Sequence, residues 1–231
     1  VLVGAMKTFA VILARGGSKA IPKKNIMTVF GEPLIKWSIE QALNSSVIED
    51  VYVSSDDLQI LDCASTFGAI PLLRSAELSG DKSTSEEGWL DVLSKLQSKH
   101  IDIGNFFAIQ ATSPVRCSSD FDNAYNIFVE GKLDSLFSAE KIRDHYIWEI
   151  NDDKFQPSNF KYSERSMRQN LKERFLENGS FYILNREKFI QKNVRHFGKI
   201  GVYVMPKFKS IQIDQFEDAL IAEALMEKFG K

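Results

Sequence analysis

Residues 9–14 read FAVILA, a continuous apolar run, and residues 15–25, RGGSKAIPKKN, follow as a basic turn that contains two adjacent glycines. An apolar run without alternation is typical of a strand that is buried on both faces, as in a parallel sheet. Adjacent glycines allow a tight turn that exposes its backbone N–H groups. We therefore expect a buried central strand that leads directly into a loop suited to binding anions.

Strand and helix patterns alternate along the chain beyond this loop. Their order, with short connections, predicts an α/β fold with a mostly parallel, Rossmann-like sheet covered by helices on both faces. The expected strands are residues 51–53, 70–73, 106–109, 180–184 and 202–205, and the expected helices are residues 34–43, 57–67, 83–99, 121–128 and a last one that contains 222–229.

The alternation breaks between residues 140 and 175. This stretch is polar, with scattered aromatic residues and five lysine or arginine positions around a Ser-Arg core, which are Lys161, Arg165, Arg168, Lys172 and Arg174. A loop of such length without structure of its own is rare in a compact domain. We interpret residues 1–231 as a single domain, with 140–175 as an insertion that is used in dimerisation.

Composition excludes several classes of protein. The formal net charge is −2, whereas a protein that coats nucleic acid is normally basic. No apolar run is long enough to span a bilayer, and the first residues do not resemble a signal peptide. The two cysteines are far apart and the three histidines have no metal-binding spacing, so a zinc site is not expected. These features predict a cytoplasmic protein with neither a nucleic-acid nor a membrane partner.

The loop after the first strand is the strongest functional motif. Arg15, Lys19 and Lys24 place three cations within one glycine-containing turn. Ligands of open α/β sheets bind beyond the carboxyl ends of the strands, where this loop must lie. The spacing is neither that of a Walker A loop nor that of a dinucleotide fingerprint. A solvated basic turn is the alternative, and we favour phosphate binding because a buried strand precedes the cations.

The segment AVILARGGSKAIPKKN, residues 10–25, resembles the signature of the CMP-sialate synthetases, or acylneuraminate cytidylyltransferases. Five further segments fall in the order of that family, and together they cover the chain from Phe9 to Phe229. They are residues 53–56 (VSSD), 76–78 (AEL) with Asp81 and Ser85, 110–114 (QATSP), 177–182 (ENGSFY) and 210–214 (SIQID).

The resemblance implies a nucleotide site around the first loop. Arg15 would contact the triphosphate with Lys19 beside it, and Lys24 would stabilise charge on the α-phosphate during displacement. Ser85 would be a nucleotide ligand and also fits as a hydroxyl at the start of a helix, and the two roles are compatible. Asp56 either contacts the nucleotide or caps the next helix, and we favour the cap. The implied nucleotide-binding set is Arg15, Gly16, Gly17, Ser18, Lys19, Lys24, Asn25 and Ser85.

Three residues are implied for the sugar acid. The Gln110 amide can both donate and accept hydrogen bonds, which suits sugar hydroxyls. Arg168 would meet a carboxylate or a phosphate, although an isolated arginine is usually a solvated one. Tyr182 would line the sugar pocket, but an aromatic residue in a strand is more often part of the core.

The metal site implied by the resemblance is Asp214, which would hold Mg²⁺ (or Mn²⁺). The family pattern there is Asp-x-Asp, whereas this chain has Gln212-Ile213-Asp214. Alternation along an expected strand would direct Gln212 and Asp214 to one face. Magnesium usually takes one or two carboxylates and completes its shell with phosphate oxygens and water. The missing first carboxylate makes Gln212 a doubtful ligand.

The resemblance thus implies a nucleotidyltransferase that joins CTP to a nonulosonic, sialic-type acid with release of pyrophosphate. The catalytic residues would be Arg15, Lys24 and Asp214, and the enzyme would be a homodimer. Three alternatives stay open: the same chemistry on legionaminate, pseudaminate or another 2-keto sugar acid, a different sugar nucleotidyltransferase, and a non-catalytic nucleotide-binding module. Retention of Gln110 and Arg168 beside the catalytic set argues against the last.

Overall fold

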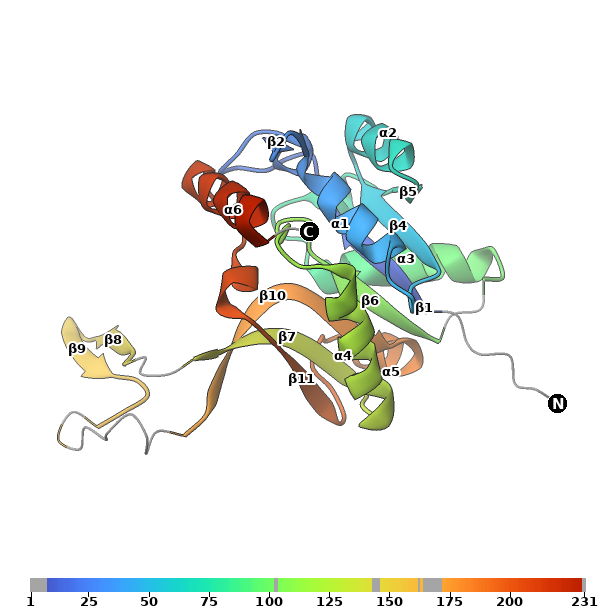
Figure 1. Cartoon of the computed structure of the whole chain (residues 1–231). Helices are drawn as coiled ribbons and strands as arrows, with labels where there is room; N and C mark the ends of the chain where they lie inside the picture. Colours follow the sequence, from blue (N-terminus) through green and yellow to red (C-terminus); the bar gives the residue numbers. More distant parts are fainter. Residues whose placement is uncertain (1–7, 102–103, 143–145, 162, 164–171, 230–231) are drawn as a thin grey trace.

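A seven-stranded sheet forms the centre of the protein in a computed structural model that describes residues 8–101, 104–142, 146–161, 163 and 172–229 (Figure 1). The strand order is β11-β7-β10-β6-β1-β4-β5, and β10 alone among them runs antiparallel to its neighbours. The strands are β1 (Thr8–Leu13), β4 (Asp50–Ser55), β5 (Ile70–Leu73), β6 (Asn105–Ile109), β7 (Ser135–Ile142), β10 (Arg174–Asn185) and β11 (Ile200–Met205).

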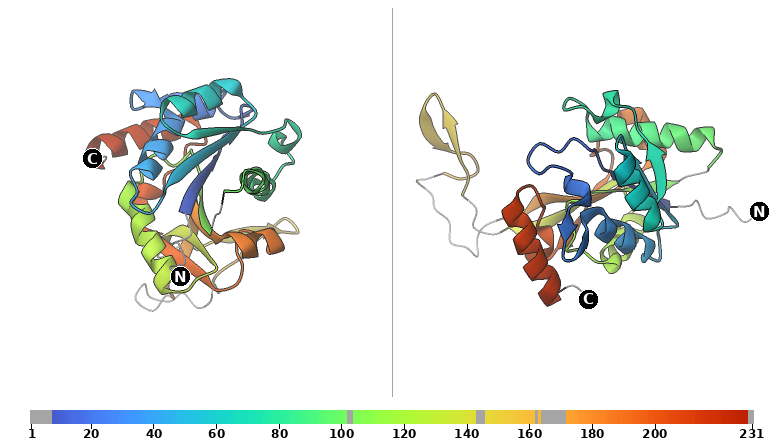
Figure 2. Two further views of the ribbon diagram at one scale, coloured as in Figure 1. Left: turned by 90° about the vertical axis from the view of Figure 1, so that its right-hand side faces the viewer. Right: turned by 90° about the horizontal axis from the view of Figure 1, so that it is seen from above.

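Helices cover both faces of this sheet (Figure 2). Ala10 and Ile12 of β1 join a core cluster on one face, and Phe9 and Val11 join a second cluster on the other. Burial on both faces is the reason for the uninterrupted apolar run, and the expected α/β fold is confirmed. The first cluster includes α1 (Leu34–Leu43), α2 (Leu58–Thr66) and α4 (Ser118–Glu130), and the second includes α3 (Ser85–Ser98) and α5 (Arg186–Lys192).

A third core cluster packs the last helix, α6 (Phe216–Phe229), against the segment that follows β1. It joins Ile21 and Val29 to Ile213 and Ala222, all of which are buried. This cluster holds the C-terminal part of the chain beside the glycine-containing loop. The short elements nearby are β2 (Thr28–Val29), β3 (Glu32–Pro33) and the 3₁₀ helices η1 (Lys24–Ile26), η2 (Glu77–Ser79) and η4 (Lys207–Ser210). No described helix is long and apolar enough to cross a membrane.

Strand β7 was not expected, because serines interrupt its apolar pattern. Ser135 Oγ donates to the carbonyl of Phe197 at 2.9 Å, and Ser138 Oγ accepts from the backbone N–H of Phe181 at 3.0 Å. Both serine side chains are fully buried. Their hydroxyls bond to the backbone of neighbouring segments, so polar residues occupy a strand inside the sheet without an unsatisfied group.

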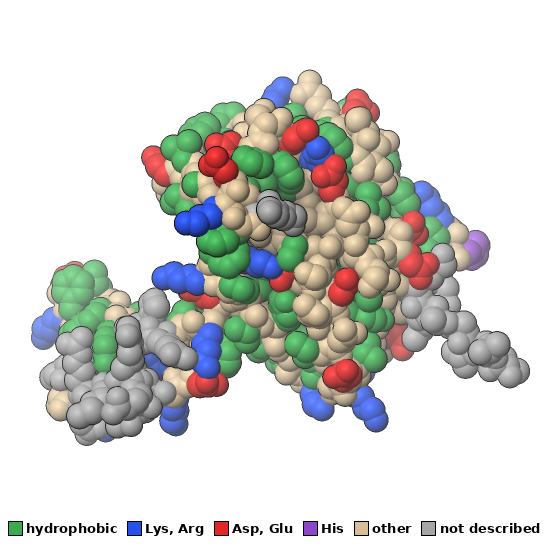
Figure 3. Space-filling model, viewed as in Figure 1, with side chains coloured by type: hydrophobic (Ala, Val, Ile, Leu, Met, Phe, Trp, Pro, Cys, Tyr) green, Lys and Arg blue, Asp and Glu red, His purple; other side chains and the backbone are tan. Residues whose placement is uncertain are grey.

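Part of the 140–175 stretch forms a small hairpin that projects from the main body (Figures 1 and 2). Its strands, β8 (Trp148–Asn151) and β9 (Lys154–Pro157), pair with each other in an antiparallel sheet separate from the central one. Apolar side chains lie open on its surface (Figure 3): Trp148 is 51% exposed, Ile150 64% and Phe155 72%.

Candidate active site

A cleft of about 330 Å³ lies at the carboxyl edge of the sheet. Parallel strands present their carboxyl ends at one edge, so the segments that follow β1, β5 and β6 meet there. The described residues that line the cleft include several expected nucleotide or sugar ligands. These are Arg15, Ser18, Lys24, Asn25, Ser85 and Gln110.

The loop after β1 is held by contacts from its own residues and from the start of α2. Asn25 is only 7% exposed, and its Nδ2 donates to the carbonyl of Arg15 at 3.0 Å. The backbone N–H of Gly16 donates to Asp56 Oδ1 at 3.0 Å. A Cβ at Gly16 would lie 2.9 Å from Cβ of Asp57, so glycine is required there by close approach.

Gly16 and Gly17 do not line the cleft in the described structure. They line a neighbouring hollow together with Lys23 and the first residues of α2. Because the N–H of Gly16 donates its hydrogen bond to Asp56, that amide is not directed at a ligand in this arrangement. The cations of the loop, and not its glycine amides, are what the structure places beside the cleft.

The cap of α2 differs from the one expected. Asp57, not Asp56, caps α2, since its Oδ1 accepts from the N–H of Gln59 at 2.8 Å. Helix α3 begins with a capping box formed by Thr84 and Glu87. Ser85 is at the start of this helix as expected, directly after the capping residue, and it lines the cleft.

Asp81 pairs with two cations at the rim of the cleft. Its carboxylate accepts from Arg15 Nη1 at 3.1 Å and from Lys19 Nζ at 2.7 Å. These hydrogen bonds hold the pKa of Asp81 below its usual value, and the bond from Lys19 has the largest effect. Since all three side chains are substantially exposed, the pairs are screened by solvent and a triphosphate could compete for both cations.

Lys24 links the loop to the C-terminal segment. Its Nζ donates to Asp214 Oδ1 at 2.9 Å and to the carbonyl of Ile213 at 3.0 Å. The N–H of Ile213 in turn donates to the carbonyl of Thr112, which lines the cleft. The Lys24 side chain is 15% exposed and that of Asp214 is 68% exposed. Two expected catalytic residues, 190 positions apart, are thus in direct contact.

The strand expected at Gln212-Ile213-Asp214 is absent, because residues 211–215 belong to no strand. The Nε2 of Gln212 donates to the carbonyl of Asn178, and the side chain lines another hollow with Glu140, Glu177 and Gly179. No cluster of three or more His, Cys, Asp or Glu residues able to hold a metal occurs in the described part of the chain. Asp214 offers Mg²⁺ one carboxylate, which its contact with Lys24 places beside the cleft, and a nucleotide phosphate would complete the shell of the ion.

A buried arginine organises the loop that carries Gln110. Arg116 is 3% exposed, and its two terminal nitrogens donate to the carbonyls of Ser180 and Gln110, each at 3.0 Å. Burial lowers the pKa of Arg116. These bonds fix the turn after β6, so that Gln110 faces the cleft. The position of Arg116 in the sequence, six residues after Gln110, was not enough to predict this role.

Arg74 is a cleft residue that sequence reasoning missed. It follows β5 directly, lines the cleft at 5% exposure, and donates from Nε to Ser79 Oγ at 2.9 Å. Burial lowers its pKa, an effect that the charge of Asp56 partly offsets. The sequence feature that could have indicated Arg74 as a site residue is its position directly after an expected parallel strand.

The other two expected sugar ligands lie elsewhere. Tyr182 is 2% exposed in the core, where its ring lies near Trp89 and its hydroxyl contacts Glu177 and Arg195. This is the core position weighed as the alternative for an aromatic residue in a strand. Arg168 lies outside the described residues.

These features together define an α/β protein with a cationic cleft of the kind that binds nucleotides at the edge of a parallel sheet. The sequence profile of the family described as Cytidylyltransferase matches residues 9–226. The chain belongs to this family, whose members are nucleotidyltransferases.

Two curated relatives show the range of the family. An N-acylneuraminate cytidylyltransferase A of Danio rerio is 36% identical over 96% of this chain, which spans about half (51%) of that relative. A pseudaminic acid cytidylyltransferase of Campylobacter jejuni is 31% identical over 95% of this chain and 96% of its own length. Among solved structures, a CMP:2-keto-3-deoxy-manno-octonic acid synthetase in complex with CTP shares the fold, with a TM-score of 0.68, 17% identity and coverage of 96% of this chain and 99% of that one.

Proposed function

We propose that this protein transfers CMP from CTP to the anomeric hydroxyl of a nonulosonic, sialic-type acid and releases pyrophosphate. The observation that carries the proposal is the cleft itself, where Arg15, Lys24 and Arg74 surround a space that Gln110 also lines. Three cations suit a triphosphate, and an amide suits the hydroxyls of a sugar. Membership of the cytidylyltransferase family supports the choice of CTP.

Catalysis in this site is a matter of position and charge. The reaction has one displacement at the α-phosphorus and needs no covalent intermediate with the protein. Lys24, held by the carbonyl of Ile213 and by Asp214, is placed to stabilise charge that develops on the phosphate. Arg15 would bind the outer phosphates. Mg²⁺ (or Mn²⁺), if held by Asp214, would supply further positive charge to the phosphate oxygens.

The experiment that tests the proposal measures pyrophosphate. The protein is incubated with CTP, Mg²⁺ and, in separate reactions, N-acetylneuraminate, legionaminate, pseudaminate and a sugar phosphate. We expect release with at least one of these acids and best with N-acetylneuraminate. Release only with a sugar phosphate would indicate a different sugar nucleotidyltransferase, and CTP binding without any release would indicate a non-catalytic module.

Nucleotide selectivity gives a first prediction. CTP should be used at least about a hundredfold better than UTP, ATP or GTP, because a site that hydrogen-bonds one base leaves polar groups unpaired with another. The measurement is kcat/KM for each nucleotide with the preferred acid at saturation. Comparable values for all four would place the chain in another class of transferase.

A second prediction concerns the oligomer. We expect a homodimer in which the hairpin of β8 and β9 lies against the partner subunit, because exposed apolar patches mark interaction sites. Phe155→Asp should then shift the mass in light scattering from dimer to monomer and lower activity. Leu58→Glu, at an apolar residue on α2 that is 64% exposed, is the matched control and should leave the dimer intact. A wild-type monomer with full activity would contradict the prediction.

A further inference from the structure

A cysteine and a lysine that do not line the cleft are in contact, in a cluster that the proposed reaction does not use. Cys117 Sγ lies 3.0 Å from Lys209 Nζ, although the two residues are 92 positions apart. Lys209 also donates to both carboxylate oxygens of Asp120, at 2.7 and 3.0 Å. The hydroxyl of Tyr203 donates to the same carboxylate at 3.0 Å. The side chain of Asp120 is 4% exposed and that of Lys209 is 15% exposed.

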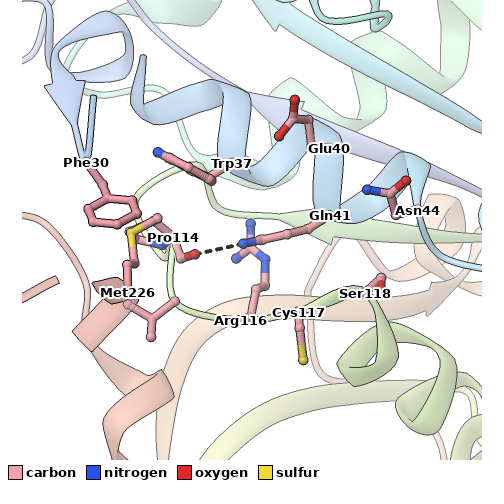
Figure 4. Close-up of a pocket in the computed structure, with 11 residues that line it drawn as sticks. Phe30, Trp37, Glu40, Gln41, Asn44, Pro114, Arg116, Cys117, Ser118 and Met226 are labelled. Carbon is pink, nitrogen blue, oxygen red and sulfur yellow. Dashed lines mark hydrogen bonds between the residues drawn. The ribbon is translucent and has the colours of Figure 1, made fainter. Parts of the chain in front are cut away.

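The surroundings of Cys117 place a nitrogen beside its sulfur. Cys117 is the N-cap residue of α4, a helix of 13 residues, and Lys209 Nζ is in contact with its sulfur, while the thiol donates to Asp120 Oδ2 at 3.3 Å. Peroxide oxidises an accessible cysteine to a sulfenic acid, which a nearby nitrogen can then capture. Cys117 is partly exposed. It also lines a cavity of about 290 Å³, where Figure 4 shows its side chain directed away from Trp37 and Gln41 on the opposite wall.

We propose that Cys117 and Lys209 form an oxidative cross-link, a covalent S–N bond made in two steps when hydrogen peroxide is present. In the first step the Cys117 thiol is oxidised to a sulfenic acid, and peroxide is reduced to one molecule of water. In the second, the ammonium group of Lys209 first loses one proton, which passes to solvent by way of Asp120, and the neutral amine then attacks the sulfur. One further N–H bond and the S–OH bond break, a second water leaves, and one hydrogen stays on the nitrogen of the new S–N bond. Condensation of a sulfenic acid with a nearby nitrogen is established chemistry.

The cross-link would join two segments that border the cleft. Cys117 follows Arg116, which bonds to the carbonyl of Gln110, and Lys209 is on η4, directly before the segment that reaches Asp214. Bond formation also removes the ammonium group that pairs with Asp120, so a buried carboxylate loses a partner. Both changes act on groups that, under the proposed function, must be accurately placed.

The other cysteine is an internal comparison. Cys63 lies on α2, in contact with the apolar core cluster, and burial raises the pKa of its thiol. Burial is the cause of that shift, and no charged neighbour in the described part of the chain contributes to it. Cys63 should therefore stay reduced under the mild peroxide treatment that modifies Cys117.

Mass spectrometry of the full chain tests the proposal without any assay of activity. After treatment with hydrogen peroxide and digestion, we expect a pair of peptides joined through Cys117 and Lys209, with the loss of two hydrogen atoms and reversal by dithiothreitol. Cys63→Ser should give the same pair. Peptides that contain Cys117 only as the thiol, or only as unlinked sulfinic acid, would overturn the proposal.

Lys209→Arg separates the two steps. Arginine keeps the charge beside Asp120 but lacks a primary amine, so we expect the sulfenic acid of Cys117 to persist and to react with dimedone. Dimedone labelling of Cys117 that is equal in wild type and Lys209→Arg would show that the lysine does not capture the sulfenic acid.

Turnover of the wild type should fall about tenfold on cross-linking and recover with dithiothreitol, since small displacements of positioned groups are costly. This last readout alone rests on the proposed function, and unchanged turnover in a cross-linked protein would overturn only the coupling to the cleft.

Discussion

Lys24→Ala and Arg15→Ala should each lower turnover by about a hundredfold or more, the usual consequence of losing one preorganised charge at a reacting phosphate. Lys24 has the stronger structural support, because its side chain is 15% exposed and its Nζ is already fixed by two hydrogen bonds. Alanine removes the cation and leaves the space beside the phosphate to water. The measurement is kcat with CTP and the preferred acid at saturation.

Lys23→Ala is the matched control for this loop. Lys23 is the neighbouring residue and carries the same charge, but it lines the other hollow and donates to Gln59 Oε1 at 2.8 Å. We expect its removal to change turnover by less than about threefold, as for an exposed polar contact. Thermal unfolding of all three variants shows whether the fold is intact. Near-normal turnover of folded Arg15→Ala and Lys24→Ala would remove the loop from the mechanism.

Asp214→Asn should abolish activity far more completely than Gln212→Ala. Asp214 contacts Lys24 and is the carboxylate that we propose as the metal ligand, whereas the amide of Gln212 is bonded to the backbone at Asn178. A carboxamide keeps the shape of Asp214 but removes the charge that Mg²⁺ prefers. With one carboxylate only, metal should bind detectably in calorimetry when CTP is present and not when the protein is alone.

Asp218→Asn provides the control for the change of charge. Asp218 lies four residues further along, in the first turn of α6, and its Oδ2 accepts from the N–H groups of Asp214 and Gln215. The amide oxygen of asparagine can still accept these bonds, so activity should stay close to normal. An active Asp214→Asn enzyme, or tight binding of Mg²⁺ to the free protein, would place the metal elsewhere.

The sequence alone was enough to predict the layers of the fold. The central strand was evident because both of its faces are buried, which requires an unbroken apolar run, and most helices show one apolar stripe. It also predicted that Arg15 and Lys24 lie beyond the end of that strand. These features depend on residues close together in the chain, so a short pattern is sufficient to reveal them.

The sequence pattern did not predict features that depend on a hydrogen-bonding partner or a neighbouring strand far away in the chain. Strand β7 is broken by serines whose hydrogen bonds come from elsewhere in the chain, and Arg74 appears as an isolated cation until β5 is placed beside β4. The expected pairing of Gln212 with Asp214 was based on a strand that the structure does not contain.

Tertiary structure alone decided which charges meet. The contact of Lys24 with Asp214 depends on the packing of α6 near the first loop, and that of Cys117 with Lys209 depends on the placement of η4 against the start of α4. Periodicity records which face of an element is buried, because burial acts on every residue of that element. It does not record the path of the chain between elements, and that path sets the distance between charges far apart in the sequence.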